Sequence, residues 1–231
     1  MLLRPGFTDI NGNYPKLRTL DAYAHIDFIG GTTENVLANY RNINALYHFT
    51  PIVNVRSILN HGILSRDQCE NTANIICYNI FGLCTDTNRY DGRKEYISCS
   101  INKPYYNMLS IKRKYIKKIG GIAILKINKS IINKANRTLF SDGNAAKRIN
   151  SVKSNEELST PDNILDDNDL FKLDAEILIR DHIPLEYIES FNFSSCDYSS
   201  YFCACYWKFL SGRWLLNFQI NDKLFGKNYN E

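Results

Sequence analysis

Short strand-like segments at irregular intervals are the feature that most constrains how this chain folds. Apolar and β-branched residues predict strands at residues 45–50, 96–101, 122–127, 175–180 and 187–193. Helical patterns fall among these strands, without the regular strand–helix alternation of a doubly wound parallel sheet. The sequence therefore predicts an α+β fold.

Prolines and glycines mark where the helices begin and end. Pro51 fits the first turn of a helix at residues 51–59, and Gly62 fits the position after its end. Pro104 starts a second helix, which continues through a basic segment to a glycine pair. We expect a polar loop at 65–95, a helical turn at 130–134, a strand at 138–140, a helix within 142–153 and an exposed loop at 154–172. We also expect a hairpin within 200–218 that turns at Ser211 and Gly212. The aromatic residues of this hairpin should pack in the core.

Composition excludes several classes of protein. The seven cysteines are irregularly spaced, which indicates reduced thiols in a cytoplasm rather than a disulfide framework. The sequence has no Cys-x-x-Cys pair and no His-x-x-x-His pair, so we expect no metal site. No apolar run is long enough to span a bilayer, and the first residues do not resemble a signal peptide. We therefore expect a cytoplasmic protein without a membrane partner.

The net charge of +4 is unevenly distributed along the chain. Basic residues crowd into residues 112–118 and continue to Lys147 and Arg148, and acidic residues follow at 156–169. Such a basic segment is a candidate for binding the phosphates of a nucleic acid. A solvated helix face would have the same composition, and charge alone favours that simpler explanation.

Two ionisable residues lie within apolar strand patterns. His48 interrupts the segment 46–50, and Glu176 interrupts the segment 174–179. A polar group in such a place is costly unless it is paired or has a chemical role. A histidine satisfied within the core, or a glutamate facing water, would explain each residue by itself. The turn Gly143-Asn144-Ala145-Ala146 between them favours a functional site.

Several segments in order resemble the DarT family of DNA ADP-ribosyltransferases. The resemblance covers residues 46 to 190 and leaves 1–44 and 195–231 outside. It is carried by Leu46-Tyr47-His48-Phe49-Thr50-Pro51-Ile52-Val53-Asn54, Ile58-Leu59-Asn60-His61-Gly62-Ile63-Leu64-Ser65, Arg89-Tyr90-Asp91-Gly92, Ile97-Ser98-Cys99-Ser100-Ile101, Tyr105-Tyr106-Asn107-Met108, Asp142-Gly143-Asn144-Ala145-Ala146, Ala175-Glu176-Ile177-Leu178 and Ile183-Pro184-Leu185-Glu186-Tyr187-Ile188.

The resemblance implies a split β-sheet with NAD in a central cleft. It also implies transfer of ADP-ribose from NAD to a base in single-stranded DNA, by a toxin that an ADP-ribose-removing antitoxin counters. Tyr105–Met108 resembles the branch associated with guanine more than the thymine branch. We expect an ADP-ribosyltransferase domain at 45–195, an N-terminal extension at 1–44, and a C-terminal extension at 196–231 that packs on the same domain.

The same resemblance suggests roles for individual residues. Glu176 would be the catalytic carboxylate, because cleavage of the nicotinamide–ribose bond builds positive charge on the ribose. Arg89, with Arg93 as its rival, would bind the NAD phosphates or stabilise the transition state. The remaining candidates are His48, Thr50, Asn54, Ser98 and Tyr106 for binding NAD, and Lys112, Arg113, Lys114, Asn144, Lys147 and Arg148 for binding nucleic acid.

Other functions remain consistent with the residues. The acceptor could be RNA or protein, because the segment 141–175 that would choose it has no readable code. An NAD glycohydrolase without a macromolecular acceptor would need the same residues. A nucleic-acid-binding module without catalysis would not need both His48 and Glu176, and their presence argues against it.

Overall fold

The computed structural model describes residues 43–71, 93–116, 120–134, 138–141, 143–145, 152–154 and 172–226, with the backbone alone at 112–116 and 152–154. All of these residues belong to the compact unit Thr32–Glu231, and the second unit, Met1–Gly31, lies outside them. Within the described residues, no helix is long and apolar enough to cross a membrane.

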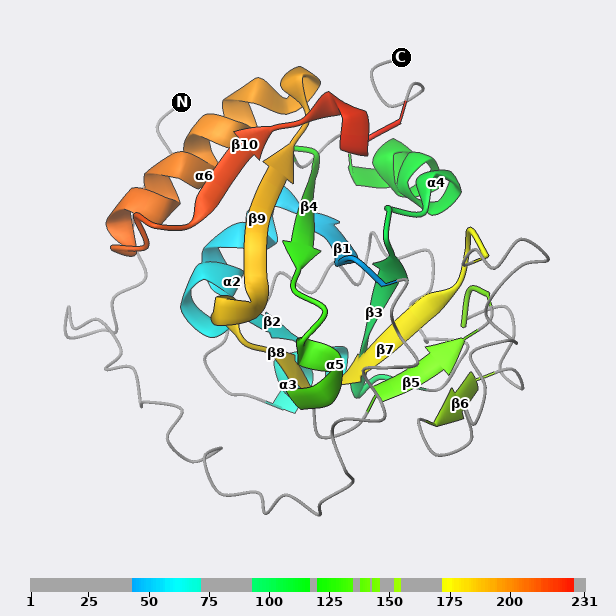
Figure 1. The fold of residues 1–231 in the computed structure, drawn as a ribbon. Coiled ribbons are helices and arrows are strands. Elements are labelled where there is room, and N and C mark those ends of the chain that lie inside the picture. The colour runs from blue at the N-terminus through cyan, green and yellow to red at the C-terminus, as the bar shows by residue number, and fades with distance from the viewer. Residues whose placement is uncertain are drawn as a thin grey trace. The chain divides into compact units, whose positions relative to one another are not determined.

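The centre of the fold is an eight-stranded sheet with the strand order β10-β9-β4-β1-β3-β7-β5-β6 (Figure 1). Neighbouring strands are antiparallel except β9 and β10, which are parallel. A separate antiparallel pair joins β2 to β8. The strands are β1 Leu46–Pro51, β2 Ile63–Leu64, β3 Tyr96–Ile101, β4 Ile122–Ile127, β5 Thr138–Ser141, β6 Val152–Ser154, β7 Glu176–Arg180, β8 His182–Ile183, β9 Ile188–Phe193 and β10 Asn217–Ile220.

Helices connect the strands and cover the sheet. Figure 1 shows α6 and β10 beside β9 at one end of the sheet, and α4 near the end of β3. The α-helices are α2 Val55–His61, α3 Arg66–Asn71, α4 Tyr106–Ile116, α5 Ile131–Lys134 and α6 Tyr198–Leu210. Short 3₁₀ turns lie at Ile52–Asn54, Leu185–Tyr187, Ser195–Asp197 and Asp222–Leu224.

Strand β4 is buried on both faces of the sheet, and a separate hydrophobic core lies on each face. Ala123, Leu125 and Ile127 belong to the larger core, which α2 and α6 cover. Ile122 and Ile124 belong to a smaller core on the other face. A strand that is buried on both faces should read as a continuous apolar run, and this one does. The predicted strand at residues 122–127 is confirmed.

The hydrogen-bond ladder of the sheet opens between β1 and β3. These strands are paired only through Leu46 and Tyr47 of β1. Beyond Tyr47, β1 continues beside β4, while the first half of β3 stays paired with β7. The α+β fold with a split sheet, which the resemblance implied, is therefore confirmed, and the split places the ends of β1 and β7 on either side of β3.

Helix α2 is capped by Gly62 as predicted, but it begins at Val55 rather than at Pro51 and ends at His61 rather than at residue 59. Pro51 has φ −57°, and the chain passes through one 3₁₀ turn before α2 begins at Val55. Gly62 ends the helix with φ +70°, and its N–H donates to the carbonyl of Ile58. A Cβ at Gly62 would overlap the carbonyl oxygen of Ile183, so both the backbone angle and the space require glycine.

The predicted hairpin within residues 200–218 is wrong. The segment instead forms α6 and the edge strand β10, which lies parallel to β9. Parallel neighbours cannot be joined by a tight turn, so a helix crosses between them. Ala204 is fully buried, and Tyr201 and Trp207 pack against the larger core at a spacing of three residues. This helical period was hidden because aromatic residues occupy the other faces too.

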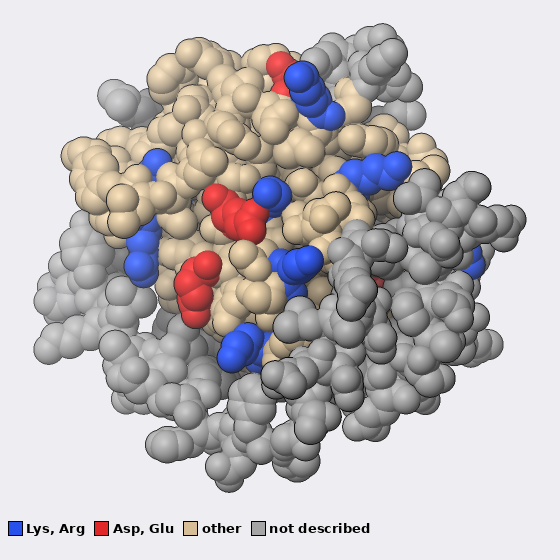
Figure 2. All heavy atoms as spheres, in the orientation of Figure 1, with Lys and Arg blue, Asp and Glu red and all other residues tan. Residues whose placement is uncertain are grey.

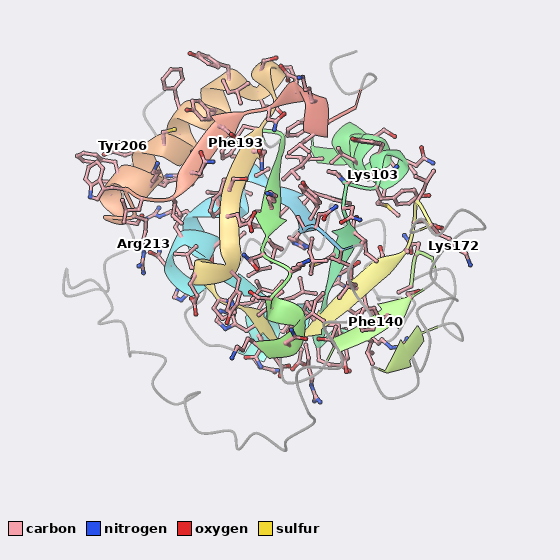
Figure 3. All side chains as sticks on the ribbon, in the orientation of Figure 1. Lys103, Phe140, Lys172, Phe193, Tyr206 and Arg213 are labelled. Atoms are coloured by element: carbon pink, nitrogen blue, oxygen red, sulfur yellow. The ribbon has the colours of Figure 1, made fainter. Side chains whose placement is uncertain are left out.

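The expectation that the tail aromatics pack in the core is only partly correct. Phe218 stacks on Phe191, with 4.7 Å between the ring centroids, as core packing predicts. Tyr206, in contrast, is 61% exposed, and Figure 3 shows it on the outer side of α6, away from the sheet. The other outward residues are Tyr198, Phe202, Phe209 and Trp214.

Residues 65–95 are not a continuous loop, because α3 occupies residues 66–71. Ser65 caps this helix: its Oγ accepts a hydrogen bond from the N–H of Gln68 at 3.2 Å. Ser-x-x-Gln is the spacing of a capping box, and Asp67 favours the first turn. That local signal was present in the sequence and was missed. Residues 72–92 of the predicted loop lie outside the described residues.

A strand also replaces the end of the helix predicted within residues 142–153. Val152–Ser154 forms β6, which pairs with β5 in register. Such a short polar segment has little strand propensity of its own, so its partner strand determines its structure. The middle of the predicted helix, residues 146–151, lies outside the described residues.

Candidate active site

Glu176 begins β7 at the point where the chain enters the sheet. Ile177, Leu178 and Ile179 after it are fully buried, while Glu176 itself is partly buried. In register, Glu176 lies between Ser100 of β3 and Ser141 of β5. Directly opposed side chains of antiparallel strands share a face, with Cβ atoms about 5 Å apart. The carboxylate is therefore flanked by a hydroxyl-bearing residue on each neighbouring strand.

The turn at residues 143–145, before β6, contacts the carboxylate of Glu176. The backbone N–H of Ala145 donates a hydrogen bond of 3.1 Å to Glu176 Oε2, across 31 residues of sequence. Ala145 and Asn144 are both buried, at 1% and 4% exposure. A hydrogen bond from a fixed backbone N–H orients a carboxylate more strictly than a mobile side chain would. The structure thus brings Asn144's turn and Glu176 together.

The pKa of the Cys99 thiol is affected by the nearby Glu176 carboxylate. Burial, and after it the nearby Glu176 carboxylate, raises the pKa of the Cys99 thiol. A fully buried thiol with a raised pKa stays protonated and is a poor nucleophile. Cys99 is therefore a core residue rather than a candidate nucleophile.

His48 reaches across the split in the sheet. Its Nδ1 lies 2.9 Å from the backbone carbonyl oxygen of Ser98, which can only accept, so Nδ1 carries the proton. In the neutral ring, Nε2 is then the acceptor. His48 alternates with Tyr47, whose register partner is Ser100, so His48 leaves β1 on the opposite face from Glu176. The His48 ring can still reach the backbone of β3, because β1 and β3 are not paired beyond Tyr47.

Thr50 and Asn54 form a polar pair where β1 passes into the first helical turn. Asn54 Nδ2 donates to Thr50 Oγ1 at 3.0 Å. Asn54 Oδ1 is buried and has no hydrogen-bond partner among the described residues, and the same holds for Ser141 Oγ beside Glu176. Buried polar atoms are nearly always satisfied, so an unpaired one needs an explanation. A polar ligand that occupies the site would supply the missing partner to each atom.

The two groups of candidates lie two strands apart in the sheet. His48, Thr50 and Asn54 belong to β1 or follow it, Glu176 belongs to β7, and β3 lies between those strands. Two strand spacings amount to about 10 Å. His48 and Glu176 leave their strands on opposite faces, and the opening between β1 and β3 is where the His48 ring turns back toward β3.

Two further candidates for binding NAD are Ser98 and Tyr106. Ser98 contributes its backbone carbonyl to His48. Tyr106 is the first residue of α4 and is 38% exposed. A Cβ at Gly226 would lie 3.1 Å from Tyr106 Cδ1, so the ring packs on the C-terminal end of the described chain. Tyr106 is also an electrostatic neighbour of Tyr47, whose pKa is raised by burial.

The remaining candidates cannot be placed by their side chains. Lys112, Arg113 and Lys114 lie on α4, where the backbone alone is described. Arg89, Lys147 and Arg148 lie outside the described residues. Among the described residues, no group of three or more His, Cys, Asp or Glu side chains could hold a metal ion.

Ser141 is a candidate that the sequence did not reveal. It is 0% exposed, its hydroxyl has no partner within the described part of the chain, and it pairs with Glu176 across β5 and β7. Its position next to Glu176 depends on the register of two strands that are 35 residues apart in number, 141 and 176. No local pattern in the sequence carries that information.

Replacing His48 with Ala should weaken the binding of NAD by about tenfold, because one directional hydrogen bond is lost. Calorimetric titration with NAD measures the affinity. His182→Ala is the matched control, since His182 lies on β8 and its Nε2 bonds to the backbone carbonyl of His61. A His48→Ala protein with normal NAD affinity and a lowered melting temperature would make His48 structural.

Comparison with known proteins places these features in context. The family model described as "ssDNA thymidine ADP-ribosyltransferase, DarT" matches residues 47–200. Thermus sp. 2.9 DarT in complex with ADP-ribosylated ssDNA superposes with a TM-score of 0.61 at 15% identity, over 81% of this chain and 99% of that chain. The same protein in complex with NAD+ gives a TM-score of 0.56 at 16% identity, over 81% and 100%.

A longer relative matches over part of its length. Thermosipho africanus DarTG in complex with ADP-ribose gives a TM-score of 0.56 at 20% identity, over 78% of this chain. This chain spans half of the Thermosipho africanus chain. No protein in the curated comparison set matches. The family that the sequence segments resembled is confirmed by the family model, and the fold is confirmed by the solved structures.

Proposed function

This chain belongs to the DarT family of single-stranded DNA ADP-ribosyltransferases, and on that premise we propose that it transfers ADP-ribose from NAD to a base in single-stranded DNA. The observation that carries the proposal is the carboxylate of Glu176, which the N–H of Ala145 fixes at the start of β7. Loss of nicotinamide leaves an oxocarbenium-like ribose, and a fixed carboxylate beside it stabilises that charge.

The polar residues at the split of the sheet would bind NAD. His48 and Ser98 already contact each other across the opening, and Asn54 Oδ1 needs a donor that a bound nucleotide could provide. Thr50 holds the amide of Asn54 in place. Tyr106 would contact the nicotinamide ring, and Arg89 would bind the phosphates.

Glu176 would act a second time when the acceptor base attacks. The attacking nitrogen loses a proton as the bond to the ribose carbon forms, and a carboxylate within hydrogen-bond reach can accept that proton. The turn 143–145 contacts Glu176 directly, so a base held by this turn would meet the same carboxylate. Asn144 is buried in the structure, and its proposed contact with nucleic acid requires the base to enter the turn.

The identity of the base is the finer part of the proposal. The segment Tyr105–Met108 resembles the guanine branch, whereas the matching family model is described by thymidine. We keep guanine as the prediction. Oligonucleotides that contain one modifiable base type each, incubated with NAD, decide the matter, and labelling of thymine alone would correct it.

The class of acceptor is tested by NAD labelled in the adenylate moiety. The protein is incubated with single-stranded DNA, RNA, a protein mixture, or no acceptor. Label in DNA supports the proposal. Label only in RNA or protein would move the chain to another acceptor class, and free ADP-ribose without any labelled acceptor would make it a glycohydrolase.

Neutralising the basic segment should weaken DNA binding and flatten its salt dependence. In the variant, Lys112, Arg113, Lys114, Lys117 and Lys118 are all replaced by Gln. Each lost phosphate contact lowers the log–log salt slope by about 0.7 on single strands. Lys134→Gln with Arg213→Gln is the control, because both residues are exposed and lie on α5 and after α6. A wild-type slope in the five-residue variant would make the segment a solvated helix face.

We also propose that the protein is a cytoplasmic toxin with an ADP-ribose-removing antitoxin, since NAD and DNA meet in that compartment. The described cysteines are all free thiols, which agrees with a reducing environment. Co-expression tests the idea: growth arrest by this chain should be relieved by an enzyme that removes ADP-ribose from DNA. Arrest that persists while the DNA is fully cleared of ADP-ribose would contradict it.

A further inference from the structure

The outer side of α6 carries a continuous row of large apolar side chains. Tyr198, Phe202, Tyr206 and Leu210 follow one another at intervals of four residues and are 51%, 56%, 61% and 62% exposed. Residues four apart on a helix line up as one ridge. We call these four residues the α6 ridge. Figure 2 shows that the surface over α6 and β10, at the upper left, carries few charged side chains.

The ridge is not needed for the core of this molecule. The inner side of α6 already packs through Ala204, Tyr201 and Trp207. The ridge points the other way, as Tyr206 shows in Figure 3. Neighbouring rings support one another along the surface: Tyr198 and Phe202 form an edge-to-face pair with centroids 4.7 Å apart. A helix that is apolar on both sides is typical of one buried on both sides.

The exposed area is sufficient for a stable interface. Phe209 on α6 is 55% exposed, and Trp214 packs on it with ring centroids 4.5 Å apart and is 58% exposed; Leu215, next in the chain, is 102% exposed. An aromatic side chain can bury about 150–250 Å², so each half-exposed ring presents about 100 Å². With the two leucines, the patch presents roughly 700 Å², above the roughly 300–600 Å² of the largest patch on a typical monomer. A standard interface buries about 600–1,000 Å² per partner, and the patch falls within that range.

The arrangement of the ridge is self-complementary. Its four residues are placed symmetrically about Ala204 along the helix. If two copies of α6 cross in antiparallel directions at that point, Phe202 faces Tyr206 of the second copy, and Tyr198 faces Leu210. A two-fold interface requires such reciprocal contacts. Ridges at intervals of four interdigitate at about −50° in helix packing.

We propose that the α6 ridge is the interface of a homodimer, formed by two copies of this chain with their α6 helices antiparallel. The family model ends at residue 200, so most of the ridge lies beyond the part of the chain that the family shares. The proposal does not depend on the enzymatic activity, because α6 is separate from Glu176 and the turn that holds it.

Charge favours a second copy over a nucleic acid as the occupant. Within α6 the single charged side chain, Lys208, lies over the ring of Phe218, 5.2 Å from its centroid. Lys208 is four residues from Ala204, so the two copies' ammonium groups would be about 12 Å apart along the helix axis. No like charges meet at the centre. A surface for single-stranded DNA would combine stacking rings with a row of cations.

Analytical ultracentrifugation of the full chain, over a range of concentrations, tests the proposal. The wild-type protein should change from monomer to dimer as its concentration rises. Phe202→Glu with Tyr206→Glu should remain monomeric over the same range, with the far-ultraviolet circular dichroism of the wild type. Ile111→Glu is the matched control, because Ile111 is 45% exposed but lies on α4, and it should dimerise normally.

Natural cysteines give a second measurement that does not depend on the ridge variants. Cys203 is exposed and adjacent to Ala204, so a short bismaleimide should join two copies through it. Cys203→Ser should abolish this cross-link, and Cys196→Ser, at the second exposed cysteine of the described residues, should not. A wild-type chain that stays monomeric at high concentration would overturn the proposal, and so would a dimer that survives the ridge substitutions. Binding of the ridge to an antitoxin by a monomeric chain would overturn it as well.

Discussion

Glu176→Gln is expected to reduce the transfer of ADP-ribose by about a hundredfold or more, while NAD binding and the fold are retained. Removing one preorganised electrostatic group from an active site typically costs that much in rate. The side-chain amide keeps an oxygen that can accept from the N–H of Ala145, so the turn at residues 143–145 keeps its contact. The loss would therefore report charge rather than packing.

The matched control for that variant is Glu189→Gln. Glu189 lies on the same sheet, in β9, and pairs with Lys126 at 2.8 Å with both side chains substantially exposed. An exposed ion pair contributes little, typically below about 1 kcal/mol. We expect Glu189→Gln to transfer at the wild-type rate. Glu176→Gln at the wild-type rate would remove the carboxylate from the mechanism.

Phe193→Ala is expected to have the largest effect on stability, a loss of about 3–5 kcal/mol in the free energy of unfolding. Phe193 is fully buried at the end of β9, close to α6 and β10 (Figure 3). Its ring centroid is 5.5 Å from that of Tyr201 on α6 and 5.5 Å from that of Phe218 on β10. Removing the ring opens a cavity where the sheet, α6 and β10 meet.

Urea unfolding measures this loss through the midpoint of the transition. Ile111→Ala is the control, because Ile111 is an exposed apolar residue and its loss should change the free energy by less than about 0.5 kcal/mol. If the free energy of unfolding of Phe193→Ala lies within about 1 kcal/mol of the wild-type value, α6 and β10 add little to the stability of the sheet.

The parts of the fold that the sequence predicted are those determined locally. The run at residues 122–127 is apolar throughout, and Pro51 and Gly62 bracket α2 by their own backbone preferences. The failures have long-range causes. β6 is a strand because β5 pairs with it, and α6 is a helix because β10 lies parallel to β9. The capping box at Ser65 and Gln68 is the exception, a local signal that was missed.

The candidate site divides in the same way. His48 and Glu176 were recognisable because each interrupts an apolar strand, and a family resemblance gave them roles. Ser141 and the N–H of Ala145 were not recognisable, because their place beside Glu176 follows from strand register and from a turn 31 residues away. The roles of all the site residues stay predictions, and so do the domain boundaries.

The central claim is that this chain joins ADP-ribose to a base that is accessible in single-stranded DNA. In a duplex the edge of the base is paired, and extruding it costs a few kcal/mol. The most direct test is mass spectrometry of one defined oligonucleotide, incubated with NAD either alone or annealed to its complement. We expect one added ADP-ribose on a single base type of the free strand, and much less on the duplex. Equal modification of both forms, or no modification of the free strand, would contradict it.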